Sequence, residues 1–291
     1  MPTFPTPEPI TVTLEIGVGA VRLTAGPRTD TVVEVRPTDP TRKADVTAAE
    51  RTRVEFTNGV LLVKTPPKNW RQLSLRGGGE SVDVRIELPA GSEVRGEAGV
   101  APLQTSGPLG ECRYKTGVGD IAVDEAGAVR LRAGAGDISV GRATGHTEIT
   151  TGSGALRIGT VEGTAVVKNS NGETRIGTVT GDLRVSASNG RIVVDRADAT
   201  VAAKTANGDV RLGRVSSGTV VAHTALGKVE VGIGDGVAAW LDLHTSFGTV
   251  HSDLDATGRP EPGDGVVEVK ARTSMGDITI HRASAPSTRQ A

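Results

Sequence analysis

Short runs of alternating apolar and polar residues, each following a glycine, recur along most of the chain. In "GDVRL", residues 208–212, Val210 and Leu212 share one side of an extended strand and the polar residues share the other. A period of two is typical of a strand with one buried face. A weaker run follows half a repeat later, as in "GTVVAHTALG" from Gly218, so each repeat consists of two strands and two turns.

Nine turn glycines mark the repeat at nearly constant intervals, which lengthen only toward the C-terminus. A β-sandwich, the alternative, varies its inward positions from strand to strand. Here residues one period apart match in type, as stacked coils require. The sequence therefore predicts an all-β, parallel β-solenoid with rungs of about 18 residues and two main strands per rung. The glycines are Gly119, Gly136, Gly154, Gly172, Gly190, Gly208, Gly227, Gly248 and Gly276.

Two columns of like residues accompany the glycines. Asn171, Asn189 and Asn207 each precede a turn glycine, which favours stacked side-chain amides. Small or hydroxyl-bearing residues form the other column and suit a stacked interior. They are Thr116, Ala133, Thr151, Asn169, Ala187, Thr205, Thr224, Thr245 and Thr273.

The solenoid repeats are expected over residues 99–282. Residues 10–98 hold longer strand pairs and start the solenoid or cap it, since an uncapped end exposes a sheet edge. Residues 1–9 and 283–291 are expected to be loose tails, and only residues 45–53, "DVTAAERTR", have a helical pattern.

Composition narrows the function classes. The chain has 39 glycines, 2% aromatic residues and a net charge of −1, so we expect a thin aliphatic core and no nucleic-acid partner. Cys112 is the single cysteine, which excludes an internal disulfide. Neither a leader-like N-terminus nor a long apolar run is present, so the expected location is the cytoplasm, at most peripheral to a membrane.

The strands also carry a family likeness. "VDVRIELPAGSEV", "GSGALRIGTVEG", "SNGETRIGTVTGDLRVSASNG" and "TANGDVRLG" resemble the putative-adhesin family of bacterial β-strand-repeat proteins of unknown function, related to the head domain of proposed surface adhesins. The likeness extends from about Ile10 to His281. It implies a right-handed β-helix without established catalytic residues, and scaffold or sensor roles beside envelope or transporter proteins.

Catalytic and ligand-binding patterns are weak. The glycines of residues 17–21 and 134–141 precede strands, whereas dinucleotide binding needs a strand-to-helix turn. Asp120 and Asp137, one rung apart, are the best pair for a sugar-cleaving enzyme, but no aromatic platform accompanies them. We therefore expect no enzyme activity and no cofactor or metal, with a polysaccharide-active enzyme as the alternative.

One column of outward residues is rich in cations and lacks acids. We call it the basic stripe, and it suits an acidic protein surface, anionic lipid headgroups or a polyanion. Trp70, in a loop with Arg71, is a candidate docking residue. We expect a non-enzymatic scaffold or interaction module that binds a protein partner or itself, with a surface adhesin as a further alternative. The basic stripe comprises Lys115, Arg132, Lys168, Lys204, His223, His244 and Arg272.

Overall fold

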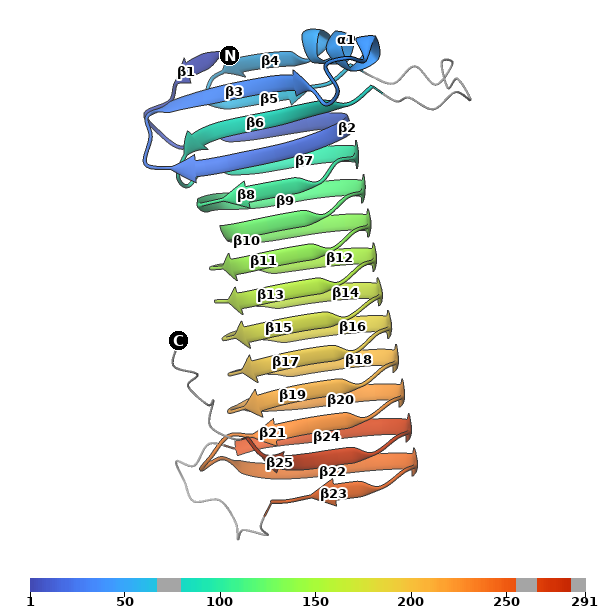
Figure 1. Ribbon diagram of the computed structural model, residues 1–291. Coiled ribbons are helices and arrows are strands. Elements are labelled where there is room, and N and C mark those ends of the chain that lie inside the picture. Colours follow the sequence, from blue (N-terminus) through green and yellow to red (C-terminus); the bar gives the residue numbers. More distant parts are fainter. Residues whose placement is uncertain (67–79, 255–265, 284–291) are drawn as a thin grey trace, which may run out of the picture. The chain divides into compact units, whose positions relative to one another are not determined.

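The structure is a computed structural model that describes residues 1–66, 80–254 and 266–283. The chain divides into two compact units, Met1–Ser153 and Gly154–Ala291. Both consist of strands stacked in parallel ladders (Figure 1). This confirms the predicted all-β solenoid. Within the described ranges, no helix has the length and apolar character needed to cross a membrane.

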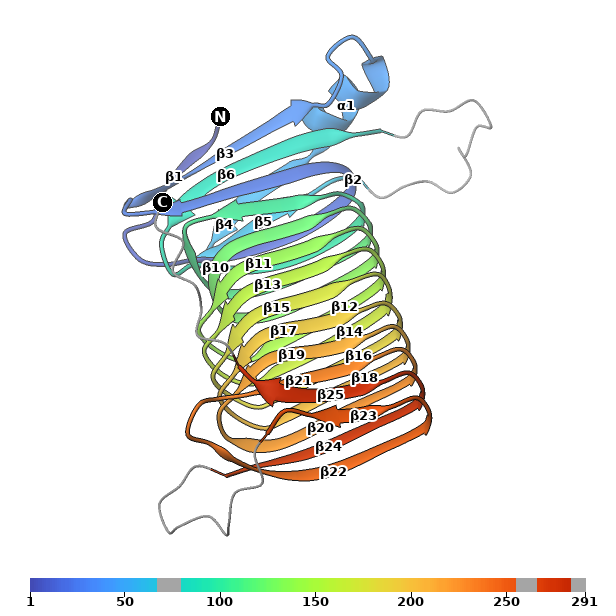
Figure 2. The same cartoon turned by 60° about the horizontal axis from the view of Figure 1, so that its bottom comes forward.

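Each coil has two strands, which form two faces that the tilted view separates (Figure 2). In the second unit the first-strand face contains β13 (Leu156–Val161), β15 (Thr174–Val179), β17 (Ile192–Ala197), β19 (Val210–Val215), β21 (Val229–Ile233), β25 (Ile278–Arg282) and β23 (Val250–Ser252). The second-strand face contains β14 (Ala165–Asn171), β16 (Leu183–Asn189), β18 (Val201–Asn207), β20 (Gly218–Leu226), β24 (Val266–Met275) and β22 (Ala238–Phe247).

The first unit uses long strands that turn the corner of a coil. The first half of β2 (Thr11–Gly26) lies between β5 (Val60–Lys64) and β7 (Glu93–Val100) on the second-strand face. Its second half lies between β6 (Val82–Pro89) and β8 (Leu103–Ser106) on the first-strand face. β10 (Ile121–Ala135) bends in the same way, pairing with β8 and β11 (Ile138–Ala143), then with β9 (Pro108–Val118) and β12 (Thr147–Ser153).

An antiparallel layer closes one end of this unit. β3 (Asp30–Pro37) pairs with β6, β4 (Arg53–Thr57) with β5, and β1 (Thr3–Pro5) with β3. The predicted helix is present as α1 (Lys43–Arg51), which contacts β3 and β6. These elements protect the edges that β5 and β6 would otherwise expose. Residues 1–9 are not the loose tail that was expected, because β1 pairs with β3 and Thr6 is buried. The expected domain boundaries at residues 98 and 282 stay predictions.

The second unit keeps the predicted register but changes the order of its last coils. Chain order predicts that β22 pairs with β20, whereas β24 lies between them, and β25 likewise separates β21 from β23. The inward columns give a physical reason. Ala203, Ala222 and Ala271 are neighbours with no exposed surface, and the larger Leu243 follows at the end, where it does not overfill the core.

The turn glycines are fixed by both conformation and space. In the second unit their φ angles lie between 132° and 154°. A Cβ atom on Gly208 would lie 2.3 Å from the carbonyl oxygen of Gly190 on the preceding coil. The buried hydroxyl column supports these turns, since Thr205 and Thr224 donate to the carbonyls of Gly190 and Gly208 at 3.2 and 2.8 Å. The repeat glycines therefore set how closely the coils stack.

Candidate functional site

The second-strand face of the first unit carries an open hollow of about 650 Å³. It lies over β2, β7, β9, β10 and β12, whose inward residues form the core and whose alternate residues point outward into the hollow. Two basic-stripe residues, Lys115 and Arg132, line it. They are directly paired in the ladder and exposed, as the sequence predicts.

A second cationic column, which the sequence analysis did not single out, runs beside them. Arg95, Arg113 and Arg130 are register partners on β7, β9 and β10. Each precedes the residue of the neighbouring column by two positions, so both columns point outward. The available signal was the spacing of these arginines, which matches the period of the turn glycines. The lining contains five cationic side chains and three carboxylates, from Glu15, Glu97 and Glu148.

These cations already have acidic neighbours. Arg95 contacts Glu93 at 2.9 Å and Arg113 contacts Glu111 at 3.0 Å, each two positions away on the same strand. Glu148 is shared by Arg132 at 3.0 Å and Arg130 at 3.3 Å. Hydrogen bonding from Arg132, with the charges of both arginines, lowers the pKa of Glu148. Lys115 lies 3.8 Å from Glu97. Exposed pairs of this kind are weak, so a ligand carboxylate can compete for the cations.

The rest of the basic stripe lies on the second-strand face of the second unit. Its order there is Lys168, Ser186, Lys204, His223, Arg272 and His244, each in register with the next. The lysine, histidine and arginine side chains of this set are all exposed. Arg272 contacts Asp242 at 3.5 Å, while within the described ranges neither Lys168 nor Lys204 has an ion pair.

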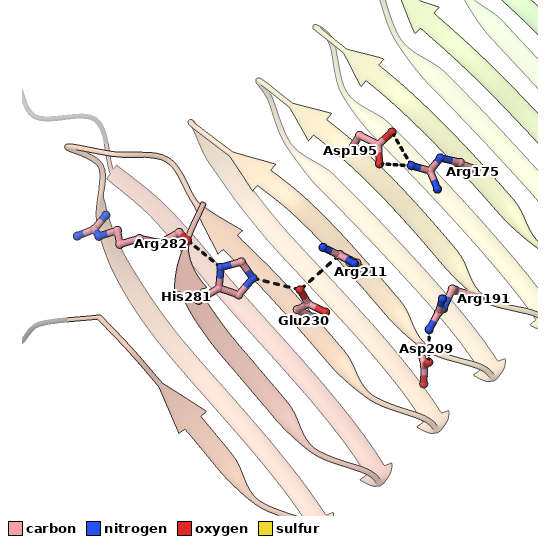
Figure 3. A network of polar contacts seen from close by, with 8 residues as sticks. All are labelled: Arg175, Arg191, Asp195, Asp209, Arg211, Glu230, His281 and Arg282. Carbon is pink, nitrogen blue, oxygen red and sulfur yellow. Dashed lines mark hydrogen bonds and ion pairs between the residues drawn. The ribbon is translucent and has the colours of Figure 1, made fainter. Parts of the chain in front are cut away.

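The first-strand face of the second unit also has charges that are paired between coils (Figure 3). Arg175 makes two contacts with Asp195, at 3.1 and 3.2 Å. Arg211 lies 3.4 Å from Glu230, which also accepts a contact from His281 at 3.2 Å. Arg175 and Arg211 are therefore each matched by an acid one coil away.

The acidic residues after the turn glycines support the backbone. The Asp120 carboxylate accepts a hydrogen bond from the Asp137 amide at 2.8 Å, and Asp209 accepts one from the Lys228 amide at 2.9 Å. Asp120 therefore uses one carboxylate oxygen to bind the main chain of the next coil. Among the described residues, no group of three or more His, Cys, Asp or Glu is placed to hold a metal. Trp70 lies outside the described residues.

No curated protein matches the chain. Similar solved structures include a "putative cell adhesion protein" from Clostridium sporogenes, with 11% identity, 97% of this chain and 98% of that chain covered, and a TM-score of 0.26. A "putative adhesin" from Bacteroides fragilis has 12% identity, 97% and 95% coverage, and a TM-score of 0.37.

Another "putative adhesin", from Parabacteroides merdae, has 11% identity, 97% and 95% coverage, and a TM-score of 0.35. The model of the family described as Toastrack DUF4097 matches residues 21–281, which confirms the resemblance noted in the strand repeats. Because this match covers most of the sequence, the chain belongs to the Toastrack DUF4097 family.

Proposed function

We propose that this protein is a non-enzymatic interaction module that binds a carboxylate-rich segment of a partner protein in the hollow of the first unit. The observation that carries the proposal is the pair of adjacent cationic columns, Arg95–Arg113–Arg130 and Lys115–Arg132, facing one hollow of about 650 Å³. Arginine side chains bind carboxylates through two parallel hydrogen bonds, which gives both affinity and orientation. An acidic segment lying across neighbouring strands would meet a cation on each of them.

The shape of the site favours a narrow ligand over a membrane. A bilayer presents a broad surface, whereas the cations here line a hollow whose sides include Glu15, Glu97 and Glu148. These carboxylates would face the anionic headgroups and oppose a flat approach. A single acidic chain can instead align with the arginine column, because its side chains reach individual guanidinium groups.

The test is the binding of fluorescein-labelled decaglutamate to the full chain, measured by fluorescence anisotropy at increasing salt. Replacing two arginines of the hollow, Arg113→Gln with Arg130→Gln, is expected to weaken binding about thirtyfold, since each exposed charged contact contributes about 1 kcal/mol and about 1.4 kcal/mol corresponds to a factor of ten. The matched control is Arg175→Gln with Arg211→Gln, which removes the same charge from the first-strand face of the second unit. That control is expected to bind as tightly as the unchanged protein.

Two outcomes would overturn the proposal. Equal weakening in both double variants would mean that only net charge matters. Loss of binding in Lys168→Gln with Lys204→Gln, but not in the arginine variant, would move the site to the second unit. Flotation with phosphatidylserine–phosphatidylcholine vesicles tests the lipid alternative. Vesicle binding that survives excess decaglutamate would contradict a single narrow site in the hollow.

A further inference from the structure

The second unit ends in a coil whose outer edge is unpaired within the described residues. β22 pairs with β24 and β23 pairs with β25, each along one edge. Inward positions that are fully buried on earlier coils are partly exposed here. Val220 and Val269 have no exposed surface, whereas their column neighbour Leu241 is half-buried. On the other face, Val250 is 46% exposed, although its column neighbour Ile278 has no exposed surface. An open strand edge and the uncovered end of the core therefore coincide.

Large apolar side chains gather at this end. Leu226, Met275 and Phe247 are register partners on β20, β24 and β22, and all three are exposed. They continue the turn column that Asn189 and Asn207 occupy on earlier coils. The chain has only two tryptophans and three phenylalanines, yet Trp240 and Phe247 both lie on β22, 70% and 72% exposed. Apolar residues concentrated beside an unpaired strand mark an interaction surface.

An unpaired edge strand is completed by another strand, and β22 is complementary to itself. Consider two copies of β22 pairing antiparallel about a twofold axis at Leu243. Leu243 then faces Leu243 of the second copy, and Asp242 faces His244 of the second copy at two equivalent places. Leu241 and Leu243 would continue the apolar interior from one copy into the other.

Neighbouring registers lack this complementarity. Centring the axis on Asp242 places two carboxylates opposite each other, and centring it on His244 places two imidazoles opposite each other. We propose that two copies of this chain associate through β22, antiparallel and centred on Leu243, so that the terminal coils of their second units form one continuous sheet. The interaction uses a surface other than the arginine-lined hollow and is independent of the acidic partner.

Site-specific disulfide formation tests both the association and its register. Directly opposed residues of an antiparallel pair have Cα atoms about 4.5–5.5 Å apart, within the range of a disulfide. Leu243→Cys is therefore expected to yield a covalent dimer under mild oxidation. The matched control Leu241→Cys faces Thr245 of the second copy, about 13 Å along the strand from its own equivalent, and is expected to stay monomeric. Cys112 is buried and does not compete.

Sedimentation equilibrium of the unmodified full chain gives an independent readout. We expect the mean mass to rise with concentration from 29.9 kDa toward twice that value. Leu243→Lys is expected to remain monomeric, because it places two ammonium groups opposite each other, while Val118→Lys, at a half-exposed valine of the first unit, is expected to associate normally. Circular dichroism melting confirms that each variant is folded. A monomer at every concentration, or equal crosslinking of the Leu241→Cys and Leu243→Cys variants, overturns the proposal.

Discussion

The packing of Gly96 against Tyr114 gives the sharpest test of the core of the first unit. A Cβ atom at position 96 would lie 2.6 and 2.9 Å from Cδ2 and Cε2 of Tyr114, and 3.3 Å from Cβ of Leu14. Ordinary carbon contacts are about 3.5–4.0 Å, so the ring would have to move by about 1 Å. It has little freedom to do so, because Tyr114 is 1% exposed and its hydroxyl donates to the Ala101 carbonyl at 3.1 Å.

The expected cost follows from these contacts. Overpacking costs about 1–3 kcal/mol and loss of the tyrosine hydrogen bond about 1 kcal/mol, so Gly96→Ala should lower the free energy of unfolding by about 2–4 kcal/mol. The assay is urea unfolding followed by far-ultraviolet circular dichroism. Gly26→Ala is the matched control, since nothing lies within 4 Å of its added Cβ. It should be neutral or slightly stabilising.

A double variant separates the clash from any general effect of alanine. Tyr114→Ala removes the ring atoms that the new methyl group would meet, Cδ2 and Cε2. In that background, Gly96→Ala should cost less than about 1 kcal/mol, giving a coupling energy of about 1–3 kcal/mol. Equal costs of Gly96→Ala in both backgrounds, or no change in the unfolding midpoint of the single variant, would refute this account.

Three further predictions concern other positions. Gly208→Ala should destabilise the fold much more than Gly236→Ala, because only the former would meet a carbonyl, at 2.3 Å; urea midpoints would compare them. The Lys228 amide and Arg191 lower the pKa of Asp209 in the folded protein, so this carboxylate stabilises the fold at neutral pH and the benefit disappears as the pH falls through the folded pKa. Asp209→Asn should therefore reduce stability at pH 7 and make little difference near pH 2. Burial raises the pKa of Cys112 to about 12, so a thiol reagent should label it only as fast as the protein unfolds.

The stacking of the coils can be predicted from the sequence because each residue is a ladder neighbour of the residue one period away, and the two are of similar type. Asn189 donates to Asn171 at 2.9 Å, as the repeated Asn-Gly turns predict. The exchange of β22 and β24 was not predicted, since either order pairs strands of the same pattern. Only the small Ala271 and the longer interval between Gly248 and Gly276 hint at it.

The candidate site was predicted in part for a similar reason. The column containing Lys115 and Arg132 is visible in the glycine-marked repeat. Arg95 lies before the regular repeats begin, in a segment that includes β2, whose insertion between later strands joins residues far apart in sequence. The hollow depends on this long-range pairing, so a local pattern did not reveal it.

The exchanged coils also impose an order on assembly. β24 and β25 cover the edges of β20 and β21 that face the end of the second unit. Until residues 266–283 have been made, these edges are uncovered. β22 and β23 are available earlier and carry a compatible pattern, but occupying that edge would bring Leu243 next to Ala222. During synthesis from the N-terminus, β22 and β23 therefore compete with β24 and β25 for the edge of β20 and β21. The first pair is made earlier, whereas the second pair packs better against that edge. The last strands of the chain, β24 and β25, are therefore the ones that complete the core, after β22 and β23 have been made.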